Sequence, residues 1–324
     1  MKRSLLALAA LTAFAGVATA QSSVTLSGRL DAGVIRSAGQ WSMGGSQSGY
    51  NAFTMSGTED LGGGMRAFFL MNHRFNIQNG TNNSGGNAST LNGGNFWRNA
   101  WVGLGGGFGD VRMGRILMPL QDVNGGYDAF DTGTVGQVHV NGLFNVANVR
   151  ANSAIYYRTP KMGGFFFHAA IAAGEGQLNS GANSERPMGF AVGYAAGPLS
   201  VAAATDRSPA NLDTIGLYAK YNLGVATVMG QFEKGDESAT LSTKGYSVSA
   251  VIPVGVGRIM AGYARIDPSG TGGARNTHSK FGIGGEYNLS KRTLIYSDIG
   301  KRSGSGLSSS ATNAMFDLGV RHAF

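Results

Sequence analysis

Apolar and polar side chains alternate along almost the whole chain beyond its N-terminal segment, and this regularity limits the folds open to it. Leu26 and Leu30 share one face of an extended chain, whereas Arg29 and Asp31 share the other. A period of two residues with one apolar and one charged face predicts a half-buried β-strand. The C-terminal segment 314–324 repeats the pattern. The sequence therefore predicts an all-β protein.

Composition excludes several other classes. Glycine accounts for 53 of the 324 residues, but proline for only 7 and cysteine for none, which excludes collagen and disulfide scaffolds. A hydrophobic content of 42% argues against disorder. A mean hydropathy of −0.05 is too polar for a bundle of membrane-spanning helices.

The N-terminus has the features of a secretory signal peptide. Lys2 and Arg3 precede a short apolar run, 5–17, which ends in the small-residue cleavage site 18–20. We expect residues 1–20 to be removed, because the run is too short for a membrane anchor. Loss of the two basic residues lowers the formal net charge from +8 to +6.

Short glycine-rich turns alternate with longer polar connections such as 77–94, 174–186, 234–243, 267–276 and 302–312. Placing a strand on each side of every turn gives sixteen strands. They span approximately 24–36, 51–60, 64–76, 95–105, 109–115, 151–159, 163–174, 187–197, 198–206, 213–222, 224–234, 244–253, 257–267, 277–289, 292–301 and 312–324.

An even number of antiparallel strands, with short turns at one end and long loops at the other, is typical of an outer-membrane barrel. A closed barrel pairs every backbone N–H and C=O group internally, as the bilayer core requires. Sixteen strands enclose a lumen too wide for side chains to fill, so the inward face must be wetted. We therefore predict a 16-stranded antiparallel transmembrane β-barrel that forms one domain over residues 21–324.

The connection 116–150 differs from the other long loops. It is rich in apolar and aromatic residues, and its only charged groups between Arg115 and Arg150 are three aspartates, Asp122, Asp128 and Asp131. A loop of this length in a compact chain is usually functional or disordered. We expect it to fold into the lumen and constrict it; the alternative is an ordinary external loop.

Local sequence patterns carry a family resemblance. They are SVTLSGRLD at 23–31, GTEDLGGG at 57–64, GDVRMGR at 109–115, and LSKRT at 289–293 followed by GVRHAF at 319–324. Together they resemble the trimeric general porins of Gram-negative bacteria, most closely the β-proteobacterial type. The resemblance covers the whole chain after residue 20.

This resemblance implies a homotrimer in the cell outer membrane that passes ions and small hydrophilic solutes by passive diffusion. It implies that loop acids face a basic barrel wall, and that Phe324 is a signal for the outer-membrane assembly machinery. The expected pore-constriction residues are Arg98, Arg150, Arg158, Asp122, Asp128 and Asp131. One departure concerns Ala52, which stands near the position where anion-selective members carry an arginine.

Charge and motif arguments support the same interpretation. Opposed aspartates and arginines across a narrow aqueous pore create a transverse field and set ion preference. The arginines favour a weak anion preference, which the loop acids oppose. The alternative for Arg98, Arg150 and Arg158 is that they are ordinary solvated residues of the lumen.

Other functions remain open from the residues alone. An adhesin or receptor barrel would use the external loops, and a barrel hydrolase would need a serine and histidine on the outer face. No nucleophile motif, metal-ligand spacing or nucleic-acid stacking motif is found, so we expect no enzyme activity, cofactor, metal or nucleic-acid partner. Expected partners besides solutes are outer-membrane lipid and lipopolysaccharide.

Overall fold

The computed structural model describes residues 23–45, 51–82, 96–140, 150–172, 186–208, 210–270, 277–304 and 314–324. The predicted signal peptide lies outside these residues, as does the segment 141–149 of the connection between 116 and 150.

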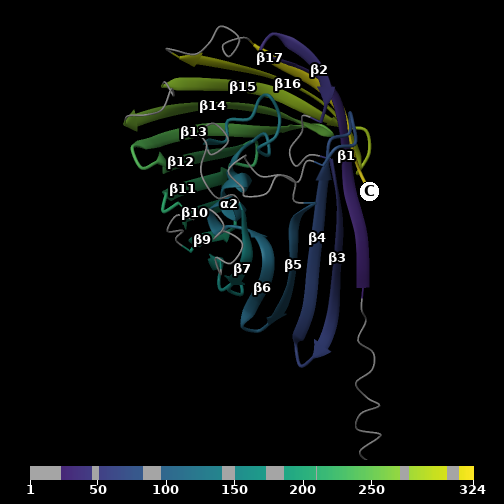
Figure 1. The fold of residues 1–324 in the computed structure, drawn as a ribbon. Helices are drawn as coiled ribbons and strands as arrows, with labels where there is room; N and C mark the ends of the chain where they lie inside the picture. The colour runs from purple at the N-terminus through teal and green to yellow at the C-terminus, as the bar shows by residue number, and fades with distance from the viewer. Residues whose placement is uncertain are drawn as a thin grey trace, which may run out of the picture.

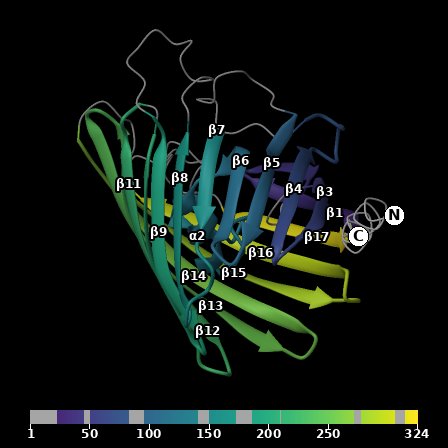
Figure 2. The same cartoon turned by 90° about the horizontal axis from the view of Figure 1, so that it is seen from below.

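The described chain forms one antiparallel sheet that closes on itself (Figures 1 and 2). The strands are β1 Ser23–Ser37, β2 Gln40–Gly44, β3 Asn51–Gly62, β4 Met65–Phe75, β5 Trp97–Gly106, β6 Gly109–Leu117, β7 Arg150–Arg158, β8 Phe165–Ala172, β9 Met188–Ala196, β10 Leu199–Arg207, β11 Asp213–Asn222, β12 Thr227–Ser238, β13 Leu241–Val254, β14 Gly257–Gly270, β15 His278–Asn288, β16 Thr293–Gly304 and β17 Met315–Ala323. Each strand pairs with the next one along the chain, except that β2 and β3 both pair with β1.

The seventeen strands occupy sixteen positions around the barrel. β2 pairs with the far end of β1, where Ser37 faces Gln40, and β3 pairs with its beginning, where Ser23 faces Thr58. The two segments therefore act as one interrupted strand. The predicted 16-stranded barrel is confirmed.

β1 and β17 close the barrel. Their ladder runs from the pair Arg29–Ala323 to the pair Arg36–Phe316. Beyond it, Gly28 and the terminal Phe324 exchange backbone hydrogen bonds with N–O distances of 2.9 and 3.0 Å. A Cβ atom at Gly28 would overlap the Phe324 ring, so glycine permits this approach.

The predicted facing of the strands is also confirmed. Leu26 and Leu30 point outward and are 62% and 38% exposed, whereas Asp31 points inward and is 1% exposed. On β15, Phe281 is outward and 49% exposed, and the neighbouring Lys280 is inward and 2% exposed. The outer surface is thus apolar because it meets lipid, and the polar groups line the interior.

Seven short connections join β3 to β4, β5 to β6, β7 to β8, β9 to β10, β11 to β12, β13 to β14 and β15 to β16, and all but the last contain glycine, as predicted. Gly197, Gly224 and Gly255 have φ values of 56°, 85° and 56°, which side chains rarely adopt. A Cβ atom at any of the three would meet nothing within 4 Å, so backbone conformation rather than crowding explains these glycines.

Two predictions about the end of the barrel that carries the long loops were wrong. β2 was missed because it follows β1 after a two-residue turn, Ala38–Gly39. The predicted loop 234–243 is instead the end of β12, a tight turn at Ala239–Thr240 and the start of β13. Above the membrane the outward face of a strand need not be apolar, so apolar alternation ends before the strand does. β14 and β16 likewise extend to Gly270 and Gly304.

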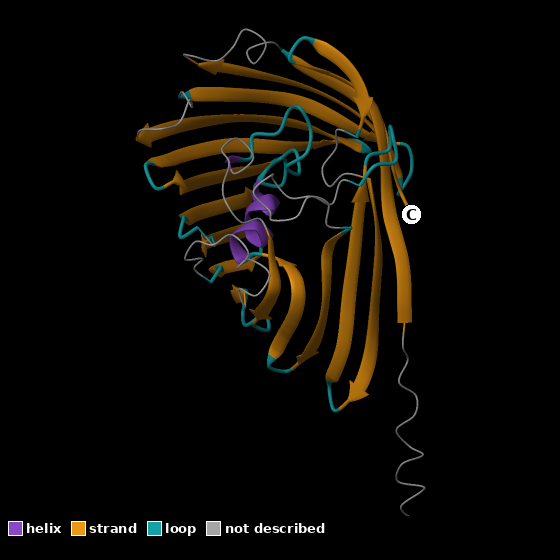
Figure 3. Ribbon diagram, in the orientation of Figure 1, coloured by secondary structure: helices purple, strands orange, loops and turns teal. Residues whose placement is uncertain are grey.

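Among the residues that the structure describes, helical structure lies in the connection between β6 and β7. α2 spans Pro119–Asn124 and continues into the 3-10 turn η1, Gly125–Tyr127, both drawn in purple inside the ring of strands in Figure 3. Within the described ranges, none of the helices has the length and apolar character needed to cross a membrane.

The outward face of β17 provides a test of this architecture. Leu318 is 52% exposed and lies on the apolar outer band. Replacing it in Leu318→Arg should cost about 2–4 kcal/mol near mid-bilayer. The matched variant Ser303→Arg places the same side chain at the polar end of β16 and should cost much less. Urea unfolding in lipid vesicles measures both; equal free energies of unfolding would contradict the assigned depth.

Candidate pore constriction

The connection between β6 and β7 folds into the barrel, as predicted. We call its described part, residues 118–140, the internal loop. Its helix α2 contacts β8, β9, β10 and β11, and its later residues reach the wall as far as β17. Figure 1 shows α2 within the ring of strands.

Hydrogen bonds fix the path of the internal loop along the inner wall. The pairs, in chain order, are Leu120 N to Asp206 Oδ1 (3.3 Å), Tyr127 Oη with Ser200 Oγ (2.9 Å), Ala129 N to Ser249 Oγ (3.2 Å), Val135 N to Asp317 Oδ2 (3.1 Å) and Val140 N to Gln231 Oε1 (3.3 Å). The loop therefore crosses the wall from β10 to β17 and returns to β12. It covers one side of the lumen and leaves the wall formed by the N-terminal strands facing it.

Apolar packing explains the unusual composition of the loop. Phe130, Val138 and Val140 form a buried cluster with wall residues that include Met260 and Ile266. A second buried cluster joins Leu120, Val123 and Tyr127 to the wall alanines Ala191, Ala202 and Ala204. The loop thus buries its apolar side chains against the wall rather than in lipid or water.

Three inward glycines on adjacent strands lie beneath the loop. Gly262 on β14 faces Gly282 on β15, which faces Gly300 on β16. We call these the glycine row. A Cβ atom on Gly282 would lie 2.7 Å from the Gly136 carbonyl carbon, and one on Gly300 would lie 3.0 Å from that of Val135. Only a wall without side chains lets the loop backbone lie this close.

Filling the glycine row should narrow the channel. In Gly282→Val the added side chain would push the loop toward the lumen axis, so single-channel conductance should fall. Gly285→Val on the outward face of the same strand is the control, because its Cβ would lie at an ordinary 3.6 Å from the Arg258 carbonyl oxygen. Equal conductance of the two variants in planar bilayers would show that the glycine row does not seat the loop.

Asp122 and Asp131 on the loop are ion-paired with arginines of the wall. Asp122 contacts Arg158 at the end of β7 and accepts a hydrogen bond of 2.9 Å from Tyr156 Oη. Asp131 Oδ2 lies 2.7 Å from Nη2 of Arg258 on β14. The structure therefore brings the predicted residues Asp122 and Arg158 together and adds Arg258, which the sequence analysis missed.

Asp128 has a different environment. It is 3% exposed and accepts hydrogen bonds from the backbone N–H groups of Thr132 (2.9 Å) and Val138 (3.4 Å). Its carboxylate braces the loop rather than facing the lumen. Burial raises the pKa of Asp128 to about 6, and these hydrogen bonds oppose the rise. His139, 6% exposed in the same loop, has its pKa lowered to about 4 by burial.

These two shifts give opposite pH dependences to loop stability. The raised pKa of Asp128 stabilises the seated loop below about pH 4, and this contribution is lost as pH rises through about 6. The lowered pKa of His139 stabilises it above about pH 6.5, and this contribution is lost as pH falls toward about 4. Over this range the two largely cancel.

Removing either group should expose the effect of the other. His139→Gln should make the loop more stable at pH 5 than at pH 7, and Asp128→Asn should make it less stable at pH 5. Hydrogen exchange of the loop amides, corrected for intrinsic rates, measures both. Parallel pH profiles in the two variants would contradict this assignment.

Arg150 and Arg98 lie on neighbouring parts of the wall. Arg150 begins β7, and its Nε donates to Asn99 Oδ1 on β5 at 2.8 Å. Arg98 precedes Asn99 in the chain, at a register shift between β4 and β5. Arg150 is thus hydrogen-bonded to Asn99, and Arg98 is the residue before Asn99 in the chain. Both predicted residues lie away from the Asp122–Arg158 pair.

Ala52 proves to have an arginine on each side. In the β-ladders, Arg29 on β1 faces Ala52 on β3, which in turn faces Arg74 on β4. Directly opposed residues project to the same face. Two guanidinium groups therefore flank the position where the resemblance implied an arginine. Strand register was needed to find them, since no local motif joins residues 29, 52 and 74.

Comparison with known proteins agrees with this architecture. The Gram-negative porin family matches residues 7–307. The chain is 35% identical to outer membrane porin protein 32 of Delftia acidovorans over 100% of both chains. Its fold is similar to that of an anion-selective porin from Comamonas acidovorans, with a TM-score of 0.77, 31% identity, and 94% and 100% of the two chains covered.

A more distant neighbour shares the fold alone. It is a trimer form of OmpT, an outer membrane protein of Vibrio cholerae, with a TM-score of 0.70, 16% identity, and 94% and 99% coverage of the two chains. The closed sheet, the inward loop and the full-length match lead to one conclusion: the chain belongs to the Gram-negative porin family and forms a channel in the outer membrane.

Proposed function

We propose that this channel passes small hydrophilic solutes and ions by passive diffusion with a preference for anions. The observation that carries the proposal is the pairing and burial of the three aspartates of the internal loop. Asp122 and Asp131 are paired with arginines, and Asp128 is buried behind the loop surface. Arg258 also binds Glu286, at 2.7 Å, so Asp131 is partly compensated, whereas Asp122 is compensated and Asp128 is withdrawn from the lumen.

The opposite wall supports the same preference. Arg29 and Arg74 flank Ala52, and Arg98 and Arg150 lie further along the N-terminal strands. Charges beyond about 8 Å are screened at physiological salt, so groups at the narrow part of the pore decide selectivity. The related porin from Comamonas acidovorans is itself described as anion-selective.

Each predicted constriction residue then has a role. Arg98 and Arg150 attract anions from the wall, and Arg158 and Asp122 form the ion-paired edge of α2. Asp131 with Arg258 forms a second edge, and Asp128 acts through the shape of the loop. We also propose removal of residues 1–20 and recognition of Phe324 by the assembly machinery; Phe324 is 44% exposed beside Gly28 and accessible for this.

A homotrimer is the proposed assembly. The family resemblance implies it, and the OmpT neighbour, which shares the fold, occurs in a trimer form. The outward face of β3 to β5 suits such a contact because it gathers aromatic rings, with Phe53 and Trp97 6.2 Å apart and His73 and Phe96 4.0 Å apart between centroids.

Reversal potentials in a potassium chloride gradient test the selectivity. Arg74→Ala and Arg150→Ala should each lower the chloride-to-potassium permeability ratio, because a wall cation is lost. Asp122→Asn should raise it, because Arg158 loses its counter-charge. Arg292→Ala, in the exposed turn between β15 and β16, is the control. An unchanged ratio in all three pore variants would place the constriction elsewhere.

A further inference from the structure

Basic side chains mark the upper margin of the apolar outer band on the C-terminal half of the barrel. Going toward the long loops, the first charged outward residue is basic on several strands of this half. These residues are Arg207 on β10, Lys234 on β12, Lys244 on β13, Arg265 on β14 and Lys301 on β16. Long loops of outer-membrane barrels face the cell exterior, so this margin lies at the outer leaflet.

Two of these cations already have anionic partners. Arg207 forms two hydrogen bonds with Asp213, at 2.7 and 2.9 Å. Arg265 lies 3.1 Å from Asp267. The charges of these two arginines are therefore balanced locally, which sets them apart from the lysines on β12 and β13.

Lys234 and Lys244 face each other directly across the β12–β13 ladder. Both side chains are outward and exposed, and within the described part of the chain neither lysine forms an ion pair. On its other side Lys244 faces Asp267 of β14, whose carboxylate is bound by Arg265. Like charges directly opposite on one face destabilise a sheet, and their Cβ atoms stand only about 5 Å apart. An anion bound between the two ammonium groups would relieve this repulsion.

The residues below this pair face lipid. Phe232 and Tyr246 also oppose each other on the same ladder, two residues nearer the membrane centre, and are 40% and 45% exposed. Tyrosine is enriched where headgroups meet the hydrocarbon region. Asp236, two residues above Lys234, marks the aqueous side. The lysine pair therefore stands at headgroup height.

An apolar groove of about 730 Å³ crosses the outer wall from β8 to β13 and reaches the residues directly below the lysines. Small outward residues, Ala203, Ala219 and Gly230, leave its floor low, and Phe232 and Tyr246 stand at its upper side. A Cβ atom on Gly230 would have only the Ser247 carbonyl oxygen within 4 Å, at 3.8 Å. The groove is thus open space on a lipid-facing wall and suits an acyl chain.

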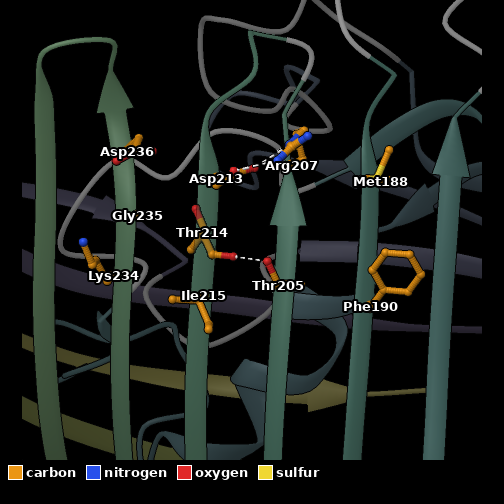
Figure 4. A pocket seen from close by; sticks show the side chains of 10 residues that line it. All are labelled: Met188, Phe190, Thr205, Arg207, Asp213, Thr214, Ile215, Lys234, Gly235 and Asp236. Atoms are coloured by element: carbon orange, nitrogen blue, oxygen red, sulfur yellow. Dashed lines mark hydrogen bonds and ion pairs between the residues drawn. The ribbon is translucent and has the colours of Figure 1, made fainter.

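A second cleft, of about 350 Å³, adjoins the pair on its other side (Figure 4). Phe190 and Ile215 give it an apolar lower part, and the Arg207–Asp213 pair closes its top. In the figure the Lys234 ammonium group points away from Ile215, and Lys244 faces Lys234 from the other neighbouring strand, β13. Lys234 thus lines this cleft and stands between it and the other lysine.

We propose that the Lys234–Lys244 pair and the groove below it form a binding site for the phosphorylated lipid A part of lipopolysaccharide. One phosphate would lie between the two ammonium groups, and one acyl chain would lie along Ala219 and Gly230. The inference rests on residence in the outer membrane. It goes beyond channel function because none of these side chains faces the lumen.

Lipid A binding to the folded, detergent-solubilised protein tests the charge requirement. Native mass spectrometry with bis-phosphorylated lipid A should give an affinity roughly thirtyfold lower for the double variant Lys234→Gln/Lys244→Gln, as two lysines lost at an anionic surface imply. The control Lys161→Gln/Lys291→Gln removes the same charge at the short-turn end and should bind normally. Lys234→Arg/Lys244→Arg should retain binding and shows that the site tolerates conservative replacement.

A second arm tests the groove without changing charge. Gly230→Leu should fill the groove and weaken lipid A binding, whereas Gly285→Leu, another outward glycine on β15, should not. Single-channel conductance should be unchanged in all of these variants, which separates failure of this site from failure of the channel. Equal affinity of the double lysine variant and the native protein, or equal binding of dephosphorylated lipid A or of phosphatidylglycerol, would overturn the proposal.

Discussion

The pairing of β1 with β17 is the interaction on which the rest of this molecule depends. A peptide group in the hydrocarbon core finds no water, so an open sheet edge there would leave a whole row of donors and acceptors unpaired. The ladder from Arg29 to Arg36, extended by the mutual hydrogen bonds of Gly28 and Phe324, removes that edge. Closure in turn creates a lumen that side chains cannot fill, and this is why an inward loop is needed to narrow it.

The loop is held by the wall in two ways that act on different parts of it. Wall carboxyl, amide and hydroxyl groups receive its backbone N–H groups at several points from Asp206 to Asp317. Its apolar side chains pack on wall alanines and methionines. The acidic residues of the loop are bound as well, since Asp122 and Asp131 pair with wall arginines and Asp128 accepts hydrogen bonds from the loop backbone. Selectivity and loop attachment therefore share one set of interactions.

The sequence predicted the barrel and the facing of its strands because lipid imposes a two-residue period wherever a strand crosses the membrane. It failed above the membrane, where that constraint ends: the hairpin at Ala239 carries no apolar alternation, and the five residues of β2 alternate over too short a run to separate it from β1. Within the loop, three aspartates look alike in sequence, and only tertiary contacts separate the buried Asp128 from the paired Asp122 and Asp131. The arginines around Ala52 required strand register, which local motifs do not contain.

The glycine row has a consequence for how such channels diversify. Gly282 and Gly300 meet the loop through main-chain atoms of Gly136 and Val135, not through particular side chains. The shape of the seat is therefore independent of which side chains the loop presents to the solute. The loop backbone at residues 135 and 136 can therefore keep its place when lumen-facing side chains are exchanged, so one scaffold can host pores of different chemistry.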